Sequence, residues 1–273
     1  MTGKARGRVV AIASGKGGVG KTNVAVNVAV ALAKLGLRVG VLDGDFGLGN
    51  VDVLLGLTPV VHLGHLLDGE RSLSEIILEG PAGVSIIPSG SGIPKLTALT
   101  SVQRGRLKLA VDQLAELLDF LIVDTASGIS ENVIETIVLA DRTLLITSLE
   151  PSAVVDAYAT AKVLSAVAPT LDIGIVVNAA RNGDEASLAF RQIEIAATRF
   201  LSRSLTYYGF IAEDASVREA VLMQRSVVEQ EPQAMASRGY RALAVRLAGL
   251  GPTSGRSVEV DAALAAEDIS RCA

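Results

Sequence analysis

Residues 15–22, GKGGVGKT, combine four glycines and two lysines in a pattern suited to holding phosphate. They fit G-x-x-x-x-G-K-[ST], follow the apolar run 9–12 and open an Ala/Val-rich segment. The glycines let backbone N–H groups converge on phosphate oxygens, and the start of the following helix adds its positive dipole end. Lys21 would reach the β- and γ-phosphates, and the Thr22 hydroxyl would bind Mg²⁺. A glycine-rich turn without a ligand is the alternative, which the order strand, loop, helix disfavours.

The loop predicts nucleotide contacts along its whole length. The residues predicted to make them are Ser14, Gly15, Lys16, Gly17, Gly18, Val19, Gly20, Lys21 and Thr22. Lys21 is also predicted to act in catalysis, because a cation stabilises charge on a transferring phosphoryl group. Lys16 is unusual, since one phosphate-binding lysine is the norm in such a loop. Its plainest reading is a solvated cation that raises the local positive potential.

Carboxylates end two further apolar runs. Asp43 and Asp45 stand two residues apart where a strand is expected to end, so both can project towards the phosphates. Asp124 ends the run FLIV at 120–123, the arrangement in which a carboxylate holds Mg²⁺ through water. A hard cation bound to phosphate oxygens prefers such ligands. For Asp43 and Asp45, a turn with solvated acids is the alternative.

Two more residues are placed where a nucleotide could be sensed or recognised. Gly128 follows Asp124 by four residues, which fits a switch that senses the γ-phosphate through its backbone N–H. Asn178 ends the run 173–177, and its amide could both donate to and accept from an adenine edge. An ordinary asparagine turn explains Asn178 equally well.

The elements that must position these residues alternate along the chain. Short apolar runs, expected as strands, are residues 8–13, 38–43, 84–88, 120–124, 143–148, 173–178 and 207–211. Longer segments, expected as helices, are residues 22–35, 101–118, 130–139, 152–167, 185–202 and 232–248. This alternation predicts a single α/β domain with a mostly parallel central sheet flanked by helices on both faces, and the motif at 15–22 makes the expected fold class a P-loop NTPase. Ligands of such sheets bind beyond the carboxyl ends of the strands, where the polar residues above are found.

Composition narrows the class of protein. The 273 residues are 49% hydrophobic and 20% charged, enough for one domain with a sizeable core. No apolar run reaches the length of about 18 residues that spans a membrane, and the short basic arm 1–7 runs directly into a strand, unlike a secretory signal. We therefore expect a cytoplasmic protein with a P-loop domain at 8–250 and an unstructured tail at 251–273. The net charge of −4 argues against nucleic acid as an obligatory partner.

The stretch KGGVGKT, residues 16–22, resembles the deviant Walker A loop of the MinD/ParA class of P-loop ATPases. The resemblance implies ATP and Mg²⁺ as ligands and an ATP-dependent homodimer, in which Lys16 reaches the partner's nucleotide and acts much as an arginine finger does. It further implies that Asp43 belongs to the water shell of Mg²⁺ and that Asp45 orients the attacking water. Asn50 would be a switch residue near the γ-phosphate.

Two stretches depart from the family pattern. Residues 126–128 read Ala-Ser-Gly where members of this kind usually have Gly-Ala-Gly, although Gly128 is kept. The stretch FIAEDASV, residues 210–217, is similar to an Ile-Pro-x-Asp segment that lines the base pocket in relatives, with Ala212 in place of the proline. The preference for adenine over guanine therefore rests on the resemblance.

Four stretches narrow the resemblance to the flagellar-number regulators, the FlhG/FleN branch. They are residues 44–57, 86–93, 124–130 and 150–162. The branch implies a slow, Mg²⁺-dependent ATPase whose partners are a flagellar GTPase of the signal-recognition-particle type, switch-complex proteins of the rotor or a flagellar transcription regulator. Related ATPases with iron–sulfur clusters need paired cysteines, whereas this chain has only Cys272.

Two other branches remain alternatives: a DNA-segregation ATPase, and a division-site positioning ATPase bound to the inner face of the membrane through its C-terminus. The segment GYRALAVRLAGLG, residues 239–251, bears on the second. Its apolar face is narrow and rich in small residues, whereas a membrane-binding helix shows a broad apolar face with bulky anchors. The pattern favours a helix packed on the domain.

Overall fold

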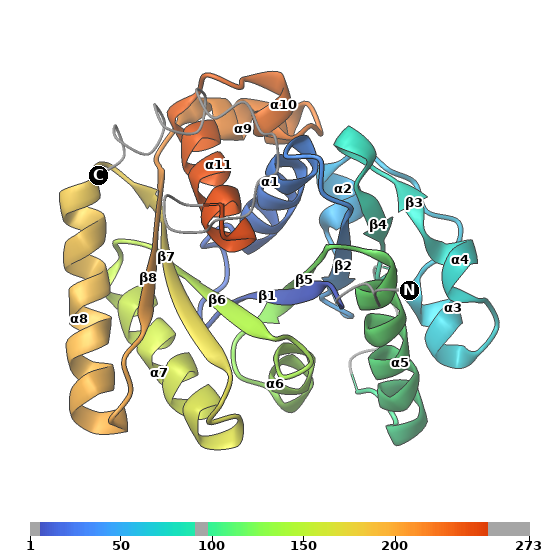
Figure 1. Cartoon of the computed structure of the whole chain (residues 1–273), viewed down its shortest axis with the longest axis horizontal. Helices are drawn as coiled ribbons and strands as arrows, with labels where there is room; N and C mark the ends of the chain where they lie inside the picture. The colour runs from blue at the N-terminus through green and yellow to red at the C-terminus, as the bar shows by residue number, and fades with distance from the viewer. Residues whose placement is uncertain (1–5, 91–97, 251–273) are drawn as a thin grey trace.

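The central element is one sheet with the strand order β3-β4-β2-β5-β1-β6-β7-β8 (Figure 1). The computed structural model describes residues 6–90 and 98–250, so the predicted tail, residues 1–5 of the predicted arm and residues 91–93 of one branch-specific stretch lie outside the described residues. The strands are β1 (Arg8–Ser14), β2 (Val39–Gly44), β3 (Leu78–Glu79), β4 (Ser85–Ile87), β5 (Phe120–Ser127), β6 (Arg142–Thr147), β7 (Asp172–Ala180) and β8 (Thr206–Ala212). Every pairing is parallel except that of β3 with β4.

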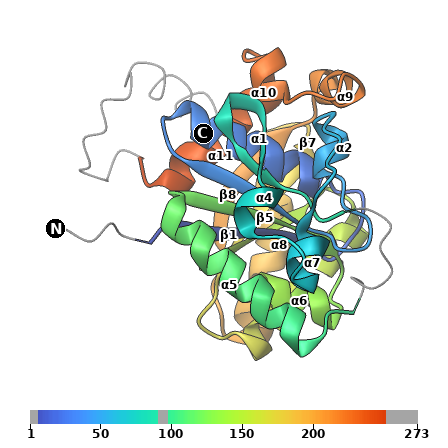
Figure 2. The same ribbon diagram turned by 90° about the vertical axis from the view of Figure 1, so that its right-hand side faces the viewer.

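Helices cover both faces of this sheet (Figures 1 and 2). One face is covered by α1 (Lys21–Lys34), α2 (Val51–Leu54), α9 (Ala215–Leu222), α10 (Val227–Gln230) and α11 (Met235–Ala248). The other is covered by α3 (Leu63–Asp68), α4 (Leu73–Ile76), α5 (Ser101–Leu117), α6 (Glu131–Ile137), α7 (Pro151–Val167) and α8 (Gly183–Leu201). A short 3₁₀ turn, η1 (Pro81–Gly83), precedes β4. The predicted fold class is confirmed.

The alternating direction of side chains along a strand explains this two-layered core. In β1, Val9 and Ala11 pack into the core below the sheet in Figure 1, and Val10 and Ile12 into the core above it. Because both faces are covered, the strand is apolar at consecutive positions. The helix α1 is buried on nearly all sides, since it packs on both the sheet and α11. Its long Ala/Val run suits that position.

All seven predicted strands and all six predicted helices are present, with shifts of up to three residues at their ends. The eighth strand, β3, has two residues and was not predicted, and neither were the short elements α2, α3, α4, η1, α9 and α10. The segment weighed as a possible membrane helix forms most of α11, whose Tyr240, Leu243 and Leu247 are buried in the domain. The packed arrangement is therefore correct for the described part of that segment. Among the described helices, none is long and apolar enough to cross a membrane.

Candidate functional site

Residues 15–20 join β1 to α1 at the carboxyl edge of the sheet. The loop is held from inside by the Ser14 hydroxyl, which donates to the Lys16 carbonyl at 2.7 Å. Gly20, the residue before α1, has φ +90°, a conformation that favours glycine. It also lies against Asn178, whose Nδ2 donates to the Val19 carbonyl at 2.7 Å and would be 2.3 Å from a Cβ at Gly20. Asn178 thus supports the loop directly.

The opposite side of the loop packs on α7. A Cβ at Gly15 would lie 2.4 Å from the carbonyl oxygen of Asp156, so this glycine is required by the close approach of the helix. Lys16 also contacts the start of α7. Its ammonium forms an ion pair with Glu150 and donates to the Ser152 hydroxyl at 2.9 Å. Lys16 therefore has partners within its own chain.

Lys21, the first residue of α1, is only 9% exposed. Its ammonium donates to the Ser127 hydroxyl at the end of β5, with an Nζ–Oγ distance of 2.6 Å. Burial lowers the pKa of Lys21, and the nearby carboxylates of Asp124 and Asp45 act in the opposite direction. An anionic ligand would strongly stabilise the charged form of a lysine buried in this way.

Asp43 and Asp124 are neighbours on adjacent strands, paired in the register of β2 with β5. Both are buried, with exposed fractions of 0% and 2%. Burial raises the pKa of Asp43 to about 8, and the charge of Asp124 adds to this effect. Burial also raises the pKa of Asp124 to about 7, although a hydrogen bond from Thr22 and the charge of Lys21 both act to lower it. Two buried carboxylates this close strongly favour a cation or a proton between them.

Asp124 has a carboxylate oxygen that could bind a hard cation. The Oδ1 atom of Asp124 is buried and, within the part of the chain that the structure describes, has no hydrogen-bond partner. Asp43 is different, because its Oδ1 accepts the Asp45 N–H at 3.1 Å and its Oδ2 accepts the Val51 N–H at 3.2 Å. The donor set of Thr22 and Asp124, with Asp43 fixed beside them, fits Mg²⁺ held partly through water.

Asp45 and Asn50 lie in the loop that follows β2. Asp45 is partly exposed, and its Oδ1 accepts the Leu48 N–H at 3.0 Å. Asn50 is exposed, and its Nδ2 donates to the Leu48 carbonyl at 2.6 Å. Gly49, in the same loop, lies close to Asp43: a Cβ at Gly49 would be 2.7 Å from Oδ2 of Asp43. The charge of Asp45 acts on Lys21, so this carboxylate lies within electrostatic range of the phosphate-binding loop.

Gly128, the residue after β5, is hydrogen-bonded to the last residue of β1. Its N–H, predicted to sense a γ-phosphate, donates to the Ser14 carbonyl at 2.9 Å. Gly128 has φ +94°, which the glycine retained in the sequence ASG accommodates. In the structure this donor is therefore already used by the residue that precedes the phosphate-binding loop.

A hollow of about 310 Å³ lies beside Asn178. It is lined by Asn23, Asn178, Ala179, residues 211–214, Val217, Arg218, Val221 and Tyr240. The stretch 210–217, compared above with a base-binding segment, contributes five of these residues. The structure thus brings Asn178 and that stretch together at one hollow.

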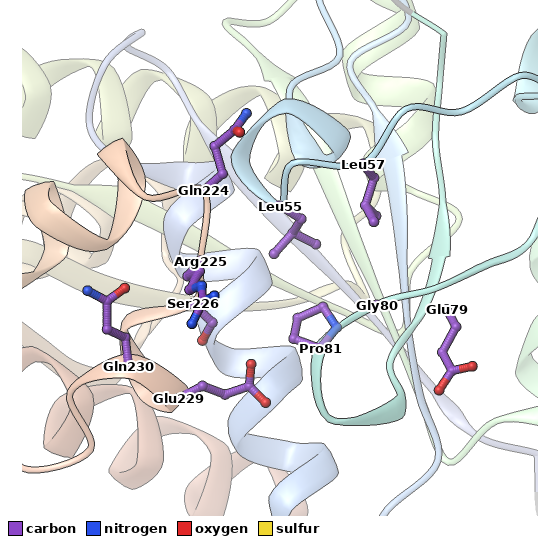
Figure 3. Close-up of a pocket in the computed structure, with 10 residues that line it drawn as sticks. All are labelled: Leu55, Leu57, Glu79, Gly80, Pro81, Gln224, Arg225, Ser226, Glu229 and Gln230. Atoms are coloured by element: carbon purple, nitrogen blue, oxygen red, sulfur yellow. The ribbon is translucent and has the colours of Figure 1, made fainter.

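Another hollow, of about 350 Å³, lies between α10 and the loops that follow α2 and β3 (Figure 3). Leu55, Leu57 and Pro81 face Gln224, Arg225 and Glu229 across it in the figure. It contains none of the predicted nucleotide contacts, but α2 connects it to the site, because the first residue of α2 donates to Asp43.

Sequence reasoning missed three side chains that hold the two lysines. In the sequence, Ser127 stands out only as a departure from the family pattern, and Glu150 and Ser152 only as part of a branch-specific stretch. Each contact joins segments more than 100 residues apart, so local pattern gives no sign of it. The substitution of serine into residues 126–128 was the one available signal.

Comparison with known proteins places the chain in a family. Residues 6–248 match the ParA family, described as NUBPL iron-transfer P-loop NTPase. The antiactivator FleN of Pseudomonas aeruginosa is 42% identical over 88% of this chain and 86% of its own. The flagellum site-determining protein YlxH of Helicobacter pylori is 33% identical over 83% of this chain and 76% of its own. The septum site-determining protein MinD of Pyrococcus horikoshii, solved with Mg-ADP, has the same fold, with a TM-score of 0.76 at 24% identity over 91% of this chain and 99% of its own.

Proposed function

The chain belongs to the ParA/MinD family of P-loop NTPases, and from this premise we propose that it is an ATP-dependent dimerising switch that regulates the number or placement of flagella. The observation that carries the switch is the second lysine of the phosphate-binding loop, Lys16. This loop follows β1, which pairs with β5, the strand whose Asp124 lies beside Asp43 of β2. The observation that carries the flagellar role is the similarity to FleN and YlxH, whose names refer to antiactivation and to flagellar site determination.

We infer that the loop 15–20 holds the phosphates of ATP and that the hollow beside Asn178 receives the base. The direction of the chain supports this, because the loop opens α1, and Asn178 links the loop to the hollow. Asn178 has one of its two N–H donors on the Val19 carbonyl, which leaves its other polar positions for a base. The similarity to a MinD solved with Mg-ADP agrees with an adenine nucleotide.

The reaction proposed is attack of water on the γ-phosphate in line with the leaving oxygen. Mg²⁺, when bound, neutralises charge on the phosphate oxygens, and Thr22, Asp124 and Asp43 would hold it. Lys21 and Lys16 add positive charge, and Asp45 orients the water. Turnover is expected to be slow, because the output of such a switch is its bound state and hydrolysis only resets it.

Lys16 would act on the nucleotide of the partner subunit. Its ammonium is partly exposed and is held by Glu150, itself at the surface, so the pair can open without unfolding any element. Exchange of this intrachain partner for a phosphate across an interface would couple dimer formation to ATP. The iron transfer in the family description is not part of the proposal, since the chain has one cysteine.

The partners proposed are a flagellar GTPase of the signal-recognition-particle type, rotor switch-complex proteins or a flagellar transcription regulator. Deletion of the gene in its host tests the role. Flagella that are too many, too few or misplaced would support it, and complementation by an Asp45→Ala variant should fail. Normal flagella with misplaced septa or lost plasmids would move the protein to the MinD-like or DNA-segregation branch.

A further inference from the structure

The two donors expected to meet a γ-phosphate are both already bonded within the chain. The ammonium of Lys21 donates to Ser127, at 2.6 Å, and the N–H of Gly128 donates to the Ser14 carbonyl, at 2.9 Å. The two bonds involve consecutive residues, Ser127 at the end of β5 and Gly128 directly after it, at the point where Ser14 and Ser127 are paired in the register of β1 with β5. Residues 127 and 128 therefore occupy the donors that the phosphate would need.

The Ser127 hydroxyl lies over the mouth of the phosphate-binding loop. It would be 3.6 Å from a Cβ placed on Gly17, and it contacts Lys21 at the other end of that loop. Lys21 is nearly buried, so its ammonium depends on acceptors from the protein. In the described residues, Ser127 provides the one hydrogen bond of this ammonium, while Asp124 and Asp45 act on it through their charges.

We propose that Ser127 and Gly128 form a latch that satisfies the γ-phosphate donors while no triphosphate is bound. The inference rests on the proposed ATP site and adds a regulatory residue to it. A phosphate oxygen makes a charge-assisted bond to lysine, which is stronger than the bond from a neutral hydroxyl, so ATP displaces Ser127. Gly128 is released in the same step, and the loop leading to α6 is then free to rearrange. Ser127 acts as a positioning residue for Lys21 and for this loop.

The latch opposes ATP binding by the free energy of its own bonds. Removal of the Ser127 hydroxyl should therefore tighten binding of a non-hydrolysable ATP analogue, by about three- to tenfold for one partly exposed hydrogen bond to a charged group. ADP lacks the γ-phosphate, so it should gain less. The variant Ser127→Ala also restores the residue usual in the resembled family, which favours correct folding.

The experiment is titration of the purified full-length chain with ATPγS and with ADP, monitored by calorimetry. Ser127→Thr keeps a hydroxyl and should bind like the wild type. Ser130→Ala is the matched control, because the Ser130 side chain lies in the same loop and makes no capping hydrogen bond to α6. If the wild type binds neither nucleotide, the proposed function fails. If it binds both but Ser127→Ala binds ATPγS no more tightly, only the latch is overturned.

A second measurement reports the loop itself. The chain contains no tryptophan, so Ile129→Trp introduces a single tryptophan beside the latch at a half-exposed position. ATPγS should shift its emission in the otherwise native chain. When Ser127→Ala is added, the nucleotide-free spectrum should shift towards the ATPγS-bound one, since one of the two bonds of the latch is lost. Identical nucleotide-free spectra with and without Ser127→Ala would contradict the latch.

Discussion

Lys16 and Glu150 form an ion pair that ties the phosphate-binding loop to the start of α7, 134 residues further along the chain. Ser152 adds a hydrogen bond to the same ammonium. The two charged side chains are 34% and 66% exposed, so their attraction is weakened by solvent. The lysine that defines the resembled ATPase class is thus held within its own chain by a contact that a phosphate could replace.

Loss of the Glu150 charge should favour the dimer. The variant Glu150→Gln frees Lys16 for the partner's nucleotide, and a surface ion pair of up to about 1 kcal/mol corresponds to a gain of up to about fivefold in dimer affinity. Sedimentation at several protein concentrations with a non-hydrolysable ATP analogue measures this. Glu116→Gln is the control, because it makes the same charge change at an exposed residue of α5. A dimer no tighter than in that control would show that the pair does not restrain Lys16.

Asp45→Ala should separate binding from turnover. Without the carboxylate that we propose to orient water, phosphate release should fall by on the order of a hundredfold or more, while the ATP analogue still binds. Asp43→Ala should act differently and raise the Mg²⁺ concentration needed for activity, because Asp43 lies beside Asp124. Steady-state phosphate release over a range of Mg²⁺ concentrations distinguishes the two. Wild-type turnover in Asp45→Ala would mean that the two carboxylates are wrongly assigned.

The Asp43–Asp124 pair should make the nucleotide-free protein less stable as the pH rises. In the folded chain the pKa is raised to about 8 for Asp43 and to about 7 for Asp124, from an ordinary value of 3.8. The folded state therefore binds protons more tightly than the unfolded state. The free energy of unfolding then falls between about pH 4 and pH 8. Tm measured in EDTA should decline over this range, and less steeply in Asp124→Asn. An equal slope in the variant would refute this origin.

Much of this site was predictable because its loops follow runs of β-branched, continuously apolar residues. Asp124 follows FLIV, and the glycine loop follows residues 9–12. The position of both could be predicted from the rule that the carboxyl ends of parallel strands lie at one edge of the sheet. The strand β3 escaped prediction because two residues, Leu78 and Glu79, carry no periodicity. The partners of Lys16 and Lys21 escaped because tertiary contacts leave no local pattern. For Gly15, the sequence indicated a phosphate contact, but α7 also requires the glycine.

The exposed face of α8 should contribute to partner binding. Arg191 and Arg199 are exposed there, together with the apolar side chains of Leu188, Ile195 and Phe200. Exposed apolar groups that gather on one helix are typical of interaction surfaces. Arg199→Glu should weaken binding to the host's flagellar GTPase or transcription regulator by about tenfold, as for loss of one favourable interfacial charge.

The helix α8 includes none of the predicted nucleotide or metal contacts, so ATP hydrolysis should be unaffected by Arg199→Glu. Lys108→Glu on exposed α5 provides a control with the same charge change. Affinities would be measured with ATP analogue and with ADP, since only a partner that distinguishes the two states is regulated by the switch. Equal loss of affinity in both variants would assign the effect to net charge.

The most direct test of the central claim is sedimentation velocity of the full-length chain with ADP and with a non-hydrolysable ATP analogue. The wild type should be a monomer with ADP and a dimer with the analogue. Lys16→Ala should remain a monomer with both while still binding nucleotide, because Lys21 and the loop amides are intact. A Lys16→Ala protein that dimerises with the analogue and hydrolyses ATP at the wild-type rate would contradict the account.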